Sequence, residues 1–296
     1  MSKNCEFDWQ KLPLEFRQSV VKKLDYLSRC RLRKCSKPDQ LLIDNTPTHL
    51  DYLTLQIDDL STQFKFRNFA VSYRDVIGCN IVRIQCQSED FSRRTELVNC
   101  SPGSHGMDLA IGDFLVLIRS LKVEKFHLQC SMCFISRERK QRFLEILTKF
   151  LRLKDLKLKV SLFHCDFAMK NEEFTGLMRR FDSRTLTDLF LGENFLDENC
   201  RIFMKKQWRN LKKASVLQPN KIPIVHFLHI EKFFTFVIRL TPQMAWMAVQ
   251  TTLTKNSLKS EFSIGSCDEL DYHEILRKFP IPVKNEPVER PWYINF

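Results

Sequence analysis

Apolar and polar positions alternate in two different rhythms along this chain. Near the N-terminus, Phe16, Val20 and Leu24 recur every fourth residue with charged side chains between them, which predicts an amphipathic helix. Ser28 can cap a second short helix, and Pro38 stands where a third could begin. The first part of the chain is therefore predicted to hold three short helices, which could also be the start of a larger all-helical domain.

From about residue 105 onward, a helical pattern followed by a short strand pattern recurs. The clearest strand covers residues 156–160, where apolar residues alternate with lysine, so that one face is buried. Corresponding strand positions lie about 25 to 33 residues apart, within the range of leucine-rich-type repeats. Repeated helix–strand units predict a parallel sheet with helices packed on one side. Helices are expected at residues 114–121, 141–147, 174–181 and 203–208, each followed by a strand, at 125–130, 156–160, 186–191 and 211–217, with two earlier strands at 50–57 and 81–84.

Two segments flank this repeat region. Residues 47–104 are expected to link the N-terminal helices to the repeats and to pack on the body. Residues 280–296 are too rich in proline to be helical, so an extended tail is expected whose aromatic residues could pack on the body or form a short linear motif. The predicted fold is thus α+β or α/β: a three-helix module at 7–46, then an irregular, leucine-rich-repeat-like helix–strand solenoid with a parallel sheet at 105–279.

The composition favours a folded protein. Of the 296 residues, 44% are apolar and 25 are Phe, which is enough for a substantial core. The run closest to a membrane span, residues 224–240, is interrupted by Glu231 and Lys232. The first residues lack the apolar segment of a secretory signal, so a cytoplasmic or nuclear location without membrane attachment is expected.

The eleven cysteines are odd in number and mostly lie within apolar patterns, which is typical of reduced core residues. Cys130 and Cys133 form a CxxC. A candidate zinc site would arise if neighbouring strands brought His127, His164 and Cys165 to this pair. Because no second CxxC completes a known spacing, we interpret the cysteines as packed thiols and expect no metal or other cofactor.

The net charge of +12 could attract nucleic acid or an acidic protein if it were clustered. Lysine and arginine are instead spread along the whole chain. The densest runs, at residues 31–34, 137–142 and 205–209, are typical of the solvated faces of amphipathic helices. Nucleic-acid binding is therefore not favoured.

The sequence lacks the common catalytic motifs. Only seven Gly occur, and there is no phosphate-binding loop, GxSxG elbow or HExxH. His226 and His229 lie three residues apart in apolar surroundings, where packed or surface histidines are more common than a catalytic pair. Cys133 or Cys165 would need a positioned base to act as a nucleophile. We therefore expect no catalytic residues and no enzymatic activity.

Several short strings follow one another in a characteristic order at residues 7–46: Trp9, Leu12-Pro13, Leu24-Asp25, Ser28-Arg29 and Ser36-Lys37. On these strings the segment resembles an F-box, in particular those of a large nematode group. Many other F-boxes have a tryptophan where this chain has Pro38-Asp39-Gln40. The resemblance implies docking on the Skp-family adaptor of a cullin–RING ubiquitin ligase. The residues implied to contact that adaptor are Leu12, Pro13, Phe16, Val20, Leu24, Leu27, Cys30 and Leu32.

The repeat region contains Leu-x-x-Leu-x-Leu strands, the string Ile-Val-His-Phe-Leu-His-Ile-Glu-Lys-Phe at residues 224–233, and a helix start at 240–244. On these features it is similar to the F-box-associated FTH domain. The two resemblances imply a non-catalytic receptor that holds a protein substrate for ubiquitin transfer, with Trp208 or Tyr272 as candidate anchors. The alternative is a basic repeat scaffold that binds RNA or an RNA-binding protein, with the N-terminal helices only as a cap.

Overall fold

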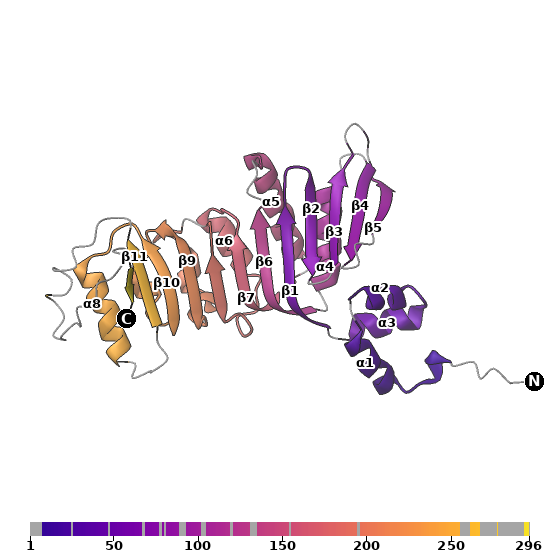
Figure 1. The fold of residues 1–296 in the computed structure, drawn as a ribbon, viewed down its shortest axis with the longest axis horizontal. Coiled ribbons are helices and arrows are strands. Elements are labelled where there is room, and N and C mark those ends of the chain that lie inside the picture. Colours follow the sequence, from indigo (N-terminus) through magenta and orange to yellow (C-terminus); the bar gives the residue numbers. More distant parts are fainter. Residues whose placement is uncertain are drawn as a thin grey trace, which may run out of the picture.

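Figure 1 shows the computed structural model of the chain, in which a group of short helices at the N-terminus is followed by one long sheet. The helices lie beyond one end of β1, and further helices accompany the sheet along its length. The structure describes residues 8–24, 26–46, 48–66, 69–76, 79, 81–88, 93–101, 105–118, 121–130, 135–153, 155–193, 196–254, 261–266, 277 and 293–295.

Three α-helices and a 3-10 turn make up the described N-terminal part. Pro13 is the N-cap of the first α-helix. The Ser36 hydroxyl caps the third by accepting a hydrogen bond from the Asp39 N–H at 3.2 Å. Ser28 lies inside the second helix rather than before it, because that helix already begins at Tyr26. The elements are η1 (Trp9–Lys11), α1 (Leu14–Lys23), α2 (Tyr26–Arg33) and α3 (Lys37–Asn45).

Twelve strands among the described residues form one sheet, in the order β12-β11-β10-β9-β8-β7-β6-β1-β2-β3-β4-β5. Strands β1 and β6 to β11 run parallel to one another, whereas β1 to β5 form an antiparallel meander. β12 lies in the tail and pairs antiparallel with β11. The strands are β1 (Thr48–Ile57), β2 (Ser61–Phe66), β3 (Phe69–Asp75), β4 (Ile81–Ser88), β5 (Arg93–Asn99), β6 (Leu121–Cys130), β7 (Lys159–Asp166), β8 (Asp188–Leu191), β9 (Lys213–Asn220), β10 (Lys232–Val237), β11 (Glu261–Ser266) and β12 (Tyr293–Asn295).

The structure is α+β, as expected, but the predicted parallel sheet is only part of a mixed one. Residues 47–104 were expected to contain two strands, and the structure has five there. The alternation that places Phe64 and Phe66 on the core face of β2 is the signal that could have revealed the missed strands. At the β1–β2 turn, Oδ1 of Asp58 accepts a hydrogen bond from the Ser61 N–H at 2.6 Å. A tight turn of this kind can connect two antiparallel strands, because only parallel strands need a long crossover connection.

Most of the parallel units bury side chains with the same spacing, at one position and then three and five residues later. The first residue of each set lies before its strand or within the first three residues of it, and the two-residue step then follows the ordinary alternation of a strand. Equivalent side chains therefore stack in rows, as where the rings of Phe126 and Phe163 lie 5.7 Å apart. The buried sets are Val123, Phe126 and Leu128; Val160, Phe163 and Cys165; Leu186, Leu189 and Leu191; Leu211, Ala214 and Val216; and Ile230, Phe233 and Thr235.

The helices between these strands differ in length from one unit to the next. α4 (Gly106–Ile118) packs on β2, β3 and β6, and α5 (Arg137–Leu153) packs between α4 and α6 (Asn171–Met178). The helix expected at residues 203–208 is divided between a 3-10 turn and a single turn of α-helix. Among the described helices, none has both the length and the apolar character needed to cross a bilayer. The remaining elements are η2 (Arg201–Met204), α7 (Lys206–Arg209), η3 (Ile224–His226) and α8 (Pro242–Thr254).

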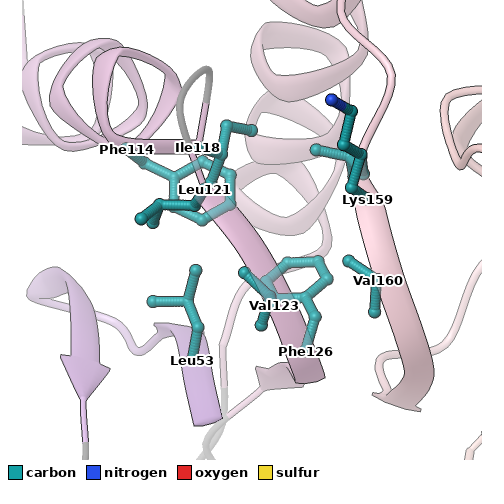
Figure 2. Close-up of a pocket in the computed structure, with 9 residues that line it drawn as sticks. Leu53, Phe114, Ile118, Leu121, Val123, Phe126, Lys159 and Val160 are labelled. Carbon is teal, nitrogen blue, oxygen red and sulfur yellow. The ribbon is translucent and has the colours of Figure 1, made fainter. Parts of the chain in front are cut away.

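The core leaves little free space where α4 meets the sheet. Figure 2 shows Phe114 and Ile118 of α4 around a cavity of about 10 Å³, together with Leu53 of β1 and Phe126 of β6. A cavity needs roughly 10–15 Å³ to hold one water molecule, and this lining is apolar apart from Lys159. The cavity is therefore a packing gap and not a ligand site.

Candidate functional site

The N-terminal helices enclose a very small core. In the described part of the chain, this cluster shares no member with the large core of the sheet. A core of this size leaves little apolar burial to stabilise three helices, and units this small usually depend on a partner. Among the described side chains, the buried apolar residues are Val21, Leu42 and Ile43, and the half-buried ones packed against them are Trp9, Leu24 and Leu32.

A buried carboxylate joins the N-terminal turn to α3. Oδ1 of Asp39 accepts hydrogen bonds from Trp9 Nε1 at 2.9 Å and from Gln10 Nε2 at 3.0 Å. Its Oδ2 accepts a third, from the Ser36 hydroxyl, at 2.6 Å. Burial by itself raises the pKa of Asp39, but these hydrogen bonds, that of Ser36 first, outweigh burial and hold the pKa below its usual value. The carboxylate thereby positions the turn that leads into α1.

Large apolar side chains remain exposed on α1 and α3. Leu14, Phe16 and Leu41 are 50%, 55% and 53% exposed. The sequence resemblance indicated Phe16 as an adaptor contact but did not indicate Leu14 or Leu41. In sequence, an apolar residue next to the apolar stripe of a helix cannot be distinguished from a core residue. Exposed apolar side chains on a unit with so small a core are typical of a docking surface.

The eight residues predicted to contact an adaptor divide into three groups. Exposed or half-buried at the surface of the turn and α1 are Leu12, Pro13, Phe16 and Val20. Packed against the small core are Leu24 and Leu32. Outside the described side chains are those of Leu27 and Cys30.

Two regions of the chain match known domain families. Residues 9–50 match the F-box domain. The N-terminal helices are an F-box. Residues 141–282 match the FTH domain, so both resemblances seen in the sequence are confirmed. No curated protein and no solved structure matches the chain. Neither match names an organism, so the nematode grouping stays a prediction.

The FTH match begins inside α5, although the fold that contains it begins earlier. Strands β2 to β6, together with α4, lie between the two matched regions. These strands belong to the same sheet as the FTH strands. Leu53 of β1, Phe114 of α4 and Phe163 of β7 are members of one core cluster. The F-box is therefore followed by one continuous sheet domain, of which the FTH match is the C-terminal part.

A second candidate site lies on the sheet face opposite this core, at β6 and β7. His127 and His164 are cross-strand partners whose rings stack with centroids 4.0 Å apart. Nε2 of His127 lies 2.8 Å from Oδ2 of Asp166, and Nε2 of His164 lies 3.1 Å from Oδ1. The Tyr52 hydroxyl lies 3.2 Å from Nδ1 of His127. Because an ionised carboxylate only accepts hydrogen bonds, both imidazoles donate from Nε2 to Asp166.

This cluster differs from the zinc site that the sequence suggested. Cys130 and Cys165 are buried on the core face of β6 and β7, so they do not meet the histidines. Burial raises the pKa of the Cys130 thiol, and Cys133 lies outside the described residues. The pKa of His164 is lowered by burial and by neighbouring His127, against the opposing effect of the carboxylate. The histidines thus combine with a carboxylate and not with thiols.

Other residues singled out in the sequence have structural roles. Trp208 is buried, and its Nε1 donates to the His226 carbonyl at 2.8 Å, so it is a core residue and not a surface anchor. The His226 ring stacks on Phe203, and Nε2 of His229 contacts the Trp208 carbonyl at 3.0 Å. Tyr272 lies outside the described residues.

Proposed function

We propose that this protein is the substrate-recognition subunit of a cullin–RING, SCF-type ubiquitin ligase. Its F-box docks on the Skp-family adaptor, which connects it to the cullin, and its sheet domain holds a protein substrate. The observation that carries the proposal is the F-box match over residues 9–50. The exposed Leu14 and Phe16 on a unit with a minimal core support it, because such a unit needs a partner surface.

In this role the chain needs no chemistry of its own. Tethering raises the effective concentration of a substrate lysine near the charged conjugating enzyme, which other subunits of the ligase supply. Specificity then depends only on which protein the sheet domain binds. The chain acts as a receptor and not as an enzyme.

The open face of the parallel sheet is the surface that we assign to the substrate. One row of side chains crosses this face in register, and it mixes aromatic with polar groups. Such a mixture suits a protein partner, because aromatic anchors and hydrogen-bonding groups together dominate protein interfaces. The row consists of Thr54, His127, His164, Phe190, Ser215, Phe234 and Ser263.

The docking prediction is tested with the double variant Leu14→Ala/Phe16→Ala. Both side chains are at least half exposed, so truncation leaves the small core intact. The variant should bind the purified Skp adaptor at least about a hundredfold more weakly, since two interface anchors of the hot-spot class are lost. Isothermal titration calorimetry of the full chain with the adaptor measures this change.

Leu217→Ala is the matched control, because Leu217 is a similarly exposed leucine (44%) on β9 of the sheet domain. It should bind the adaptor as the wild type does. A folded wild-type chain that fails to bind the adaptor, or a double variant that binds with unchanged affinity, would contradict the docking role.

The RNA-scaffold alternative needs a continuous positive strip. The next row of cross-strand partners in the described sheet mixes the two signs of charge, and Lys232 forms an ion pair with Glu261 at 2.6 Å. A row that mixes positive and negative side chains does not create the positive potential that would attract a phosphate backbone. The row consists of Tyr52, Lys125, Leu162, Asp188, Lys213, Lys232 and Glu261.

A further inference from the structure

The cluster of His127, His164 and Asp166 on the open face of β6 and β7 has no role in docking on the adaptor. One ligand-capable atom from each of His127, His164 and Asp166 lies within 4.8 Å of the others. Two imidazoles and a carboxylate are a common donor set for zinc and for other divalent transition metals. The three side chains come from adjacent parallel strands of a rigid sheet, which limits how far they can separate.

The separations between these atoms are close to those that a bound ion requires. Zinc bonds of 2.0–2.2 Å in tetrahedral geometry place neighbouring ligand atoms about 3.4 Å apart. The two imidazole–carboxylate distances are 2.8 Å to Oδ2 and 3.1 Å to Oδ1, and the two rings lie nearly parallel, at 7°, so both side chains would have to rotate for their Nε2 atoms to converge on one ion. No strand needs to shift register for an ion to replace the two shared protons.

Tyr52 can support the proton arrangement that metal binding needs. Without a metal, His127 carries its proton on Nε2, and the Tyr52 hydroxyl donates to Nδ1. When Nε2 coordinates an ion, the proton resides on Nδ1, and the same hydroxyl can accept it. Metal-ligating histidines usually donate their other ring nitrogen in this way, which holds the ring in position.

Gly192 leaves the space that the carboxylate occupies. It directly follows β8, and its N–H donates to the Cys165 carbonyl at 2.9 Å. A Cβ at this position would collide with Oδ1 of Asp166. The absence of a side chain at Gly192 therefore leaves room for the Asp166 carboxylate in its present position.

We propose that His127, His164 and Asp166 form a zinc-binding site on the open face of the sheet. The side chain of Asp166 is 29% exposed and that of His164 is 18% exposed, so solvent can reach the ion. Three protein ligands leave at least one coordination position for water or for a group of a bound protein.

The test is a calorimetric titration of the metal-free full chain with Zn²⁺ near neutral pH, followed by X-ray absorption spectroscopy of the one-to-one complex. We expect one ion bound with micromolar or tighter affinity, and scattering from two imidazoles and oxygen without sulfur. Asp166→Asn and His164→Gln, which preserve much of the side-chain shape, should each weaken binding by at least about a hundredfold. Gly192→Ala should also weaken it, by displacing the carboxylate.

His49→Gln is the matched control, since it removes the exposed histidine of another His–Asp pair, 3.8 Å from Asp51. It should leave zinc affinity unchanged. Sulfur scattering together with loss of binding in Cys130→Ser would overturn the proposal and assign the metal to the CxxC. Absence of binding, or binding equal in wild type, His164→Gln and Asp166→Asn with folding verified by circular dichroism, would reduce the cluster to an ordinary hydrogen-bonded group.

Discussion

Where few apolar side chains are buried, single polar side chains connect neighbouring elements of this chain through hydrogen bonds. In the F-box, Asp39 accepts hydrogen bonds from Trp9, Gln10 and Ser36, and so connects the N-terminal turn to α3. These bonds stabilise the ionised carboxylate and lower its pKa. Stability from a group with a lowered folded-state pKa is complete above its unfolded value, about 3.9 for Asp, and is lost as the pH falls through the folded value.

Asp39→Asn should therefore destabilise the F-box by about 1–2 kcal/mol near neutral pH, because hydrogen bonds to a charged acceptor are replaced by weaker neutral ones. The variant should also lose less stability than the wild type when the pH is lowered through the acid range. Urea unfolding followed by the indole N–H NMR signal of Trp9 measures both effects in the intact chain. Equal acid sensitivity in the two proteins would show that Asp39 does not titrate as the hydrogen bonds require.

Within the sheet, individual strands depend on buried polar groups where their connections are irregular. Asn220, at the end of β9, donates from Nδ2 to the Phe236 carbonyl at 2.7 Å and to the Thr235 hydroxyl at 3.0 Å. Its Oδ1 accepts from the Ile222 N–H at 3.1 Å. The residue is 2% exposed and lies where the β9–β10 register shifts. Its side chain therefore hydrogen-bonds backbone groups that the regular pairing of the two strands does not satisfy.

Asn220→Ala should lower the free energy of unfolding of the sheet domain by about 2–4 kcal/mol, because it leaves a buried N–H and a buried carbonyl without partners. Urea denaturation followed by circular dichroism checks this value. The matched control, Asn199→Ala, removes an exposed asparagine and should change stability by less than about 0.5 kcal/mol. A similar small change in Asn220→Ala would mean that the register shift is stabilised by other contacts.

At the scale of the whole molecule, the sheet domain is larger than the region that matches FTH. The rows of the core continue across residue 141, as where Phe126 of β6 stacks on Phe163 of β7. β6 in turn pairs with β1, which connects the repeats to the antiparallel meander. Among the described residues, the buried cluster of the F-box helices is separate from this core.

A chain truncated to residues 141–282 should therefore fail to fold, because it exposes the core face of β7 and the edge that β6 covers. A chain of residues 47–296 should fold without the F-box. Proton NMR dispersion and thermal unfolding of the two proteins distinguish these outcomes. A cooperatively folded 141–282 fragment would show that the FTH region is independent of β1 to β6.

The sequence by itself determined the F-box and the FTH resemblance, because these depend on local order, such as Leu12-Pro13 before a helix. It placed the clearest strand at residues 156–160, whereas the structure has β7 at Lys159–Asp166, because the alternation of leucine and lysine also suits the residues that lead into a strand. It also indicated that His127 and His164 could meet. Only the tertiary structure decided that they meet Asp166 and not the cysteines, since alternation along each strand sends neighbouring residues to opposite faces. The mixed sheet likewise depended on long-range pairing between β1 and β6, which no local pattern specifies.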